Sequence, residues 1–118
     1  MDRKRFRQLF ITEQGKLSKE EMHSIMEKSI DVLSDGNNRG NQNIIIVVQE
    51  CSELIQELTD CLRGKGDAVG LLEELADVAI CIEYVKMIYK IDDATLDTAI
   101  KIKIDELKRK MESGTKIC

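Results

Sequence analysis

Two long apolar segments joined by a short glycine-containing loop constrain the fold of this chain more than any other feature. Apolar residues recur at helical spacing through residues 41–63 and again, on nearly every side, through residues 68–90. The five β-branched residues at 44–48 are also typical of a buried strand, but the helical period continues beyond them without a break. Because the loop at 63–67 is short, the sequence predicts two antiparallel helices that lie side by side.

Signals on either side of this hairpin predict two more helices. Ser18 followed by Glu21 has the form of a capping box, and apolar residues then recur at helical spacing over 18–34. Asp92 can cap a last helix over 93–112, which has an apolar stripe on one face and basic side chains on the others. The chain contains no proline, two Phe and two Tyr, and this composition favours helices over a β-sandwich.

We therefore expect an all-α fold in which residues 18–118 form a four-helix bundle with a loop at 35–40. Residues 1–17 are a basic N-terminal extension, which we expect to be either solvated or docked on a partner. The apolar run at 44–48 and the helix at 68–90 carry more apolar surface than one small bundle can cover. We expect oligomerisation to complete the bundle, in a homodimer or a homotetramer.

Charge and composition argue against several classes of protein. The formal net charge of −4 argues against nucleic acid as a partner, although a DNA-binding arm at the basic residues 1–7 is an alternative. No apolar stretch reaches about 18 residues and no segment has signal-peptide form, so we expect no membrane partner. The four cysteines show no Cys-x-x-Cys spacing and there is one histidine, which argues against zinc and favours reduced thiols in a cytoplasmic protein.

Two pairs of acidic residues stand out in the predicted hairpin. Glu50 and Glu53 are three residues apart, as are Glu74 and Asp77, so each pair projects two carboxylates from one face of its helix. Measured from the loop, the two pairs lie within about one helical turn of the same level. Four carboxylates that meet on partly apolar ground repel one another, and a divalent cation is the simplest remedy. Oxygen ligands favour Mg²⁺, with Mn²⁺ as the alternative, over zinc.

The acidic pairs and their neighbours resemble the motifs of a known family. Gln-Glu-x-x-Glu-Leu at 49–54 followed by Glu-Glu-Leu-Ala-Asp-Val at 73–78 is similar to the motif pair of the MazG-like all-α nucleoside triphosphate pyrophosphohydrolases. The resemblance extends over roughly residues 40–112. It implies a MazG-like bundle and a Mg²⁺-dependent enzyme that cleaves a nucleoside triphosphate between the α and β phosphates. The products would be a nucleoside monophosphate and pyrophosphate.

The resemblance also implies roles for individual residues. The metal would be held by four acids, Glu50, Glu53, Glu74 and Asp77. Glu50 or Glu53 would orient or deprotonate the attacking water. The leaving pyrophosphate needs cations, for which the candidates are Lys103, Lys110, Arg63 and Lys65, with ordinary solvated side chains as the alternative. The family has a Lys-x-x-x-Asn-x-x-Arg pattern in the last helix. At these positions the chain has Lys103, then Leu107 in place of the Asn and Lys110 in place of the Arg.

Two other functions compete with this interpretation. A non-catalytic helical assembly or regulatory protein that retains the MazG-like fold would bind no metal and hydrolyse nothing. A di-iron carboxylate bundle is disfavoured, because that chemistry normally uses Glu-x-x-His and His23 is the single histidine.

Overall fold

The structure is a computed structural model that describes residues 1–13, 15–34 and 40–114. These residues form five helices and no strand: α1 (Arg3–Thr12), α2 (Lys19–Leu33), α3 (Asn41–Leu62), α4 (Ala68–Ile88) and α5 (Asp93–Ser113). The prediction of an all-α fold is confirmed, and each of the four expected helices begins and ends within two residues of its predicted bounds. The predicted loop at 35–40 lies outside the described residues except for Gly40.

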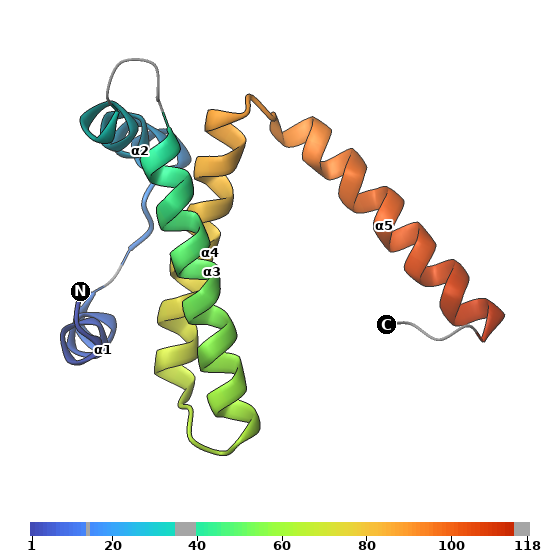
Figure 1. The fold of residues 1–118 in the computed structure, drawn as a ribbon, viewed down its shortest axis with the longest axis horizontal. Coiled ribbons are helices and arrows are strands. Elements are labelled where there is room, and N and C mark those ends of the chain that lie inside the picture. The colour runs from blue at the N-terminus through green and yellow to red at the C-terminus, as the bar shows by residue number, and fades with distance from the viewer. Residues whose placement is uncertain (14, 35–39, 115–118) are drawn as a thin grey trace.

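Helices α3 and α4 form the antiparallel hairpin on which the other elements depend (Figure 1). Gly64 in the connecting turn adopts a left-handed conformation with φ +74°, which a residue without Cβ tolerates. The carbonyl of Asp60 accepts hydrogen bonds from the N–H groups of Lys65 and Gly66, so the turn satisfies a carbonyl in the last turn of α3. Asp67 caps α4, because its side chain accepts a hydrogen bond from the backbone of the first turn.

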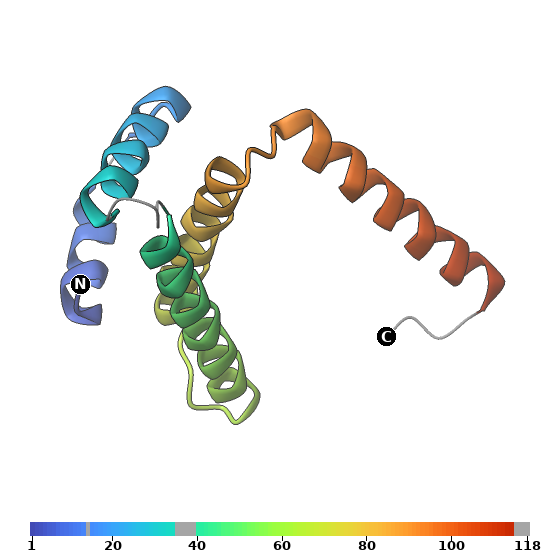
Figure 2. The ribbon, with the colours of Figure 1, turned by 45° about the horizontal axis from the view of Figure 1, so that its top comes forward.

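Helix α2 packs across the end of the hairpin that lies away from this turn (Figure 2). Ser18 caps the helix as predicted, and Met26 and Ile30 on its inner face are buried. The hydroxyl of Tyr84 on α4 donates a hydrogen bond to the hydroxyl of Ser29 at 3.0 Å. This hydrogen bond and a second one between His23 and Glu83 at 2.9 Å join α2 to α4.

Helix α1 lies in the segment that the sequence analysis treated as a solvated or partner-docked extension. Asp2 caps it by accepting a hydrogen bond from the N–H of Arg5 at 2.8 Å, and the rings of Phe6 and Phe10 stack on one face. The helix lies against α4 of the same chain, with Arg7 in an ion pair with Asp67 at 3.0 Å. The extension is therefore a docked helix that charge, rather than an apolar stripe, holds in place.

Helix α5 leaves the end of α4 and extends away from the other helices (Figures 1 and 2). Asp93 in its first turn pairs with Lys19 of α2 and Lys86 of α4, and these two cations hold the pKa of Asp93 at about 2. The rest of the helix is open, and Ile100 and Ile104 of its predicted apolar stripe are exposed. One chain alone therefore does not form a closed four-helix bundle, and the completion of the bundle by oligomerisation stays a prediction.

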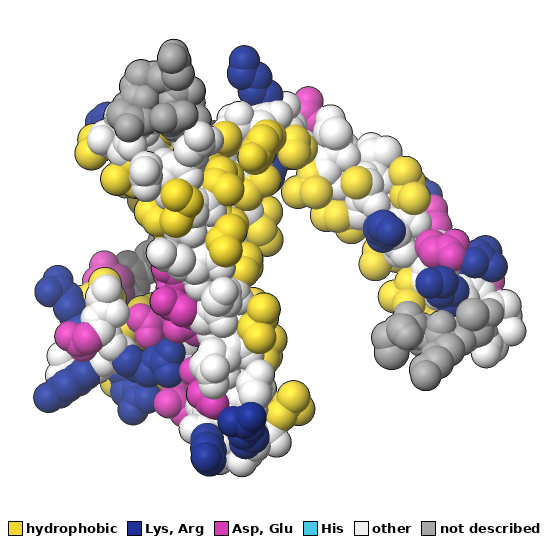
Figure 3. All heavy atoms as spheres, viewed as in Figure 1, with side chains coloured by type: hydrophobic (Ala, Val, Ile, Leu, Met, Phe, Trp, Pro, Cys, Tyr) yellow, Lys and Arg dark blue, Asp and Glu magenta, His cyan; other side chains and the backbone are white. Residues whose placement is uncertain are grey.

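Many large hydrophobic side chains of the described residues are exposed. Figure 3 shows hydrophobic side chains along the side of the hairpin that faces α5 and along the side of α5 that faces the hairpin. The buried hydrophobic side chains of the described residues are Met26, Ile30 and Cys81. In the described parts of the chain, every helix is too short or too polar to cross a membrane.

Candidate metal centre

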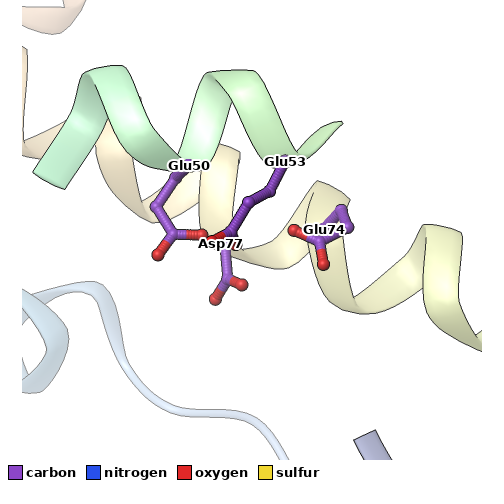
Figure 4. Close-up of side chains that lie close together, drawn as sticks. All are labelled: Glu50, Glu53, Glu74 and Asp77. Atoms are coloured by element: carbon purple, nitrogen blue, oxygen red, sulfur yellow. The ribbon is translucent and has the colours of Figure 1, made fainter. Parts of the chain in front are cut away.

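The four predicted acids come together in the middle of the hairpin. Glu50 and Glu53 project from α3 toward Glu74 and Asp77 of α4 (Figure 4). One carboxylate oxygen from each residue lies within 4.8 Å of the corresponding oxygen of every other. We call these four residues the acidic cluster. This proximity confirms the prediction that both pairs meet at one level. The pairs meet because the short turn fixes the register of the two helices.

Burial makes the acidic cluster electrostatically costly. Glu74 is buried, Glu50 and Asp77 are half-buried, and Glu53 is exposed. Burial and, after it, the negative charges of Asp77 and Glu53 raise the pKa of Glu50 to about 7. Burial is also the largest cause that raises the pKa values of Glu74 and Asp77, with neighbouring carboxylates adding to it. The cluster therefore holds protons near neutral pH or requires a positive charge beside it.

The oxygen atoms of the acidic cluster fit a divalent cation. One oxygen of Glu50 and one of Glu74, Oε2 in each case, are buried and have no hydrogen-bond partner among the described residues. A buried carboxylate oxygen without a partner is unfavourable, and a coordinated cation would satisfy it. The donor set consists of carboxylates alone, which suits Mg²⁺ or Mn²⁺ better than zinc.

Arg3 of α1 lies beside the acidic cluster and contacts three carboxylates at once. Its Nη1 donates to Glu57 at 3.1 Å, its Nε to Glu73 at 3.2 Å and its Nη2 to Glu74 at 3.0 Å. The hydrogen bond to Glu57 is the largest of the interactions that raise the pKa of Arg3. We call Glu57, Glu73 and Glu74 the Arg3 carboxylates. Glu74 belongs to both groups and links them.

Arg3, Glu57 and Glu73 belong to the site although no sequence pattern predicted them there. Arg3 is 54 residues from Glu57 and 70 from Glu73, so no local spacing indicates these contacts. Gly70 was the one sequence signal of a close contact at this place. A glycine inside a helix lowers stability by about 1 kcal/mol relative to alanine, so its presence suggests that a side chain would not fit there. A Cβ at Gly70 would lie 2.6 Å from Nη1 of Arg3 and 2.8 Å from Oε1 of Glu57. The glycine therefore makes room for the ion pair.

A cavity of about 760 Å³ opens over the acidic cluster and over Glu73 of the Arg3 carboxylates. Its walls are formed by α1, α3 and α4, and Met1, Arg3 and Phe6 supply the α1 side. The predicted pyrophosphate-binding residues do not line it: Arg63 and Lys65 lie in the α3–α4 turn, and Lys103 and Lys110 lie on the projecting α5. Within one chain, the structure does not bring these four cations to the acidic cluster.

Comparison with protein-family models, curated proteins and solved structures gave no match. The resemblance to MazG-like enzymes thus stays a prediction that rests on the Glu50–Glu53 and Glu74–Asp77 motifs.

Proposed function

We propose that the protein is a Mg²⁺-dependent nucleotide pyrophosphohydrolase. It cleaves a nucleoside triphosphate between the α and β phosphates and releases a nucleoside monophosphate and pyrophosphate. The observation that supports this most strongly is the convergence of four carboxylates with two buried, unpartnered oxygens, one on Glu50 and one on Glu74. Carboxylates are the ligands with which proteins hold Mg²⁺ beside phosphates. The motif resemblance supplies the reaction class.

The acidic cluster would hold Mg²⁺, with Mn²⁺ as the alternative. When bound, the ion would offset the charge of the phosphates and lower the pKa of a nearby water. Glu50 or Glu53 would orient that water or take its proton. The exposed side chain of Glu53 is the better placed of the two, because it reaches water that enters from solvent, whereas one oxygen of Glu50 is buried.

The cavity suits a nucleotide in size and in chemistry. Its volume of about 760 Å³ lies within the usual range for small-molecule sites, about 300–1,000 Å³. Its lining combines carboxylates with the apolar side chains of Phe6, Ala76 and Ile80, which offer surface for a base. The triphosphate would lie toward the metal, and the base would lie against these apolar side chains.

The enzyme would act as a homodimer or homotetramer. Three buried hydrophobic side chains among the described residues are few for a chain of 118 residues, and a second copy would cover the open faces of the hairpin and α5. Such a partner would also bring basic residues of its own to the cavity. Lys103, Lys110, Arg63 and Lys65 are proposed on this basis as ligands of the leaving pyrophosphate.

The test is a panel of nucleoside triphosphates with Mg²⁺, scored separately for pyrophosphate and orthophosphate. We expect pyrophosphate from the wild type and none from Glu53→Gln or Asp77→Asn, with helical circular dichroism retained. Asp97→Asn on exposed α5 is the matched control and should keep full turnover. Orthophosphate as the product would contradict the proposed bond cleavage. No product and no Mn²⁺ binding would favour the non-catalytic alternative.

A further inference from the structure

The Arg3 carboxylates form a second cation position next to the acidic cluster. The side chains of Glu57, Glu73 and Glu74 are 8%, 12% and 10% exposed, so water contributes little to the solvation of their charges. Like charges this close and this poorly hydrated need a positive charge among them. In the structure the guanidinium of Arg3 provides it, with one nitrogen on each carboxylate.

Glu74 connects the two cation positions through its two oxygens. Oε1 accepts the hydrogen bond from Arg3, and Oε2 is buried without a partner. Phosphate-processing enzymes with two metal ions place the ions about 3.5–4 Å apart. We propose that Arg3 occupies the second of two adjacent cation positions and thereby limits this site to one divalent ion. This second position depends on the metal centre of the proposed function, and it adds Arg3 of α1 to that centre.

Several features of α1 and α4 serve to seat this guanidinium. Gly70 leaves the space in which Nη1 of Arg3 meets Glu57, and a side chain there would fill it. Arg7 pairs with Asp67 one helical turn further along α1 and anchors the helix at the start of α4. Asp2 caps α1 directly before Arg3, which fixes the point at which the helix begins. The positive charge that the Arg3 carboxylates require is thus supplied by the chain itself and not by a second metal ion.

The test counts Mn²⁺ ions bound to the full chain after chelator treatment. Isothermal titration gives the number of equivalents, and electron paramagnetic resonance shows whether two ions are spin-coupled. We expect one equivalent and an uncoupled spectrum for the wild type. Arg3→Met removes the charge and should bind two equivalents with a coupled spectrum. Adding Glu57→Gln to Arg3→Met should return the count to one.

Two control variants separate the role of Arg3 from the charge of α1 in general. Arg3→Lys keeps a positive charge at the same place and should stay at one equivalent. Arg5→Met removes the same charge from the same helix, at a side chain that lines a different cavity, and should also stay at one. Circular dichroism checks that every variant remains helical.

Each failure has its own meaning. One equivalent in Arg3→Met would overturn the inference and leave the metal centre intact. A spin-coupled pair in the wild type would overturn it too, and this measurement does not depend on how the variant folds. If the wild type binds no Mn²⁺, both the inference and the metal centre are overturned. The proposed reaction has its own test, which is the release of pyrophosphate.

Discussion

Metal binding should weaken steeply as the pH falls through neutrality, because the acidic cluster must lose protons to accept an ion. Burial and the charges of Asp77 and Glu53 raise the pKa of Glu50 to about 7. A carboxyl group with that pKa is about one-tenth ionised near pH 6 and about nine-tenths ionised near pH 8. From Glu50 alone, the apparent Mn²⁺ affinity should therefore fall about tenfold between those two values.

Glu74 and Asp77 add to this dependence in the same direction, because their pKa values are raised as well. The assay is calorimetric titration with Mn²⁺ at constant ionic strength near pH 6, 7 and 8. Repeating it in two buffers of different ionisation enthalpy gives the protons released, which should be about half a proton from Glu50 near pH 7. Glu50→Gln should bind more weakly and lose most of the pH dependence, whereas Asp97→Asn should retain it. An affinity that is constant across this range would refute the reasoning.

Three further predictions follow from the same contacts. Folding raises the pKa of Glu50 to about 7, so the stabilising effect of its protonated form is complete below the unfolded carboxyl pKa and disappears as the pH rises through about 7, and the raised pKa of Glu74 acts in the same direction. Thermal melts of chelated protein should thus give a lower Tm at about pH 8 than at about pH 5.5, and saturating Mg²⁺ should reverse the order. Gly70→Ala should lower the Tm, since the new Cβ would force the ends of Arg3 and Glu57 out of their ion pair, and it should raise the Tm when Arg3→Ala and Glu57→Ala together remove both contacts and leave a helix-propensity gain of about 1 kcal/mol. Ile104→Glu on α5 should reduce the mass found by sedimentation while helicity persists; an unchanged mass would exclude this face from the subunit contact.

The parts of the fold that sequence predicted correctly have local signals. Ser18 and Asp92 cap the helices that follow them, and the apolar period marks the bounds of α3. The acidic cluster was predictable because a three-residue spacing and a short turn fix where side chains of two neighbouring helices meet. These side chains therefore lie close together because they belong to two consecutive helices joined by a short turn.

The contacts that sequence did not predict join distant segments through charge. Arg3 reaches Glu57 across 54 residues, and a single arginine in a basic segment shows nothing of its partner. Asp2 is a local helix-start signal that the sequence analysis did not use. The open position of α5 has a different cause, since an apolar stripe indicates which face is buried but not what covers it.

Met1 lies in the wall of the acidic cavity, next to the carboxylates of α3 and α4. Any residues fused in front of it would emerge at the mouth of the cavity. A polyhistidine purification tag at this end would bring imidazoles, which are strong ligands for transition metals, within reach of the ion under study. Any tag at this end therefore needs to be removed before metal binding is measured.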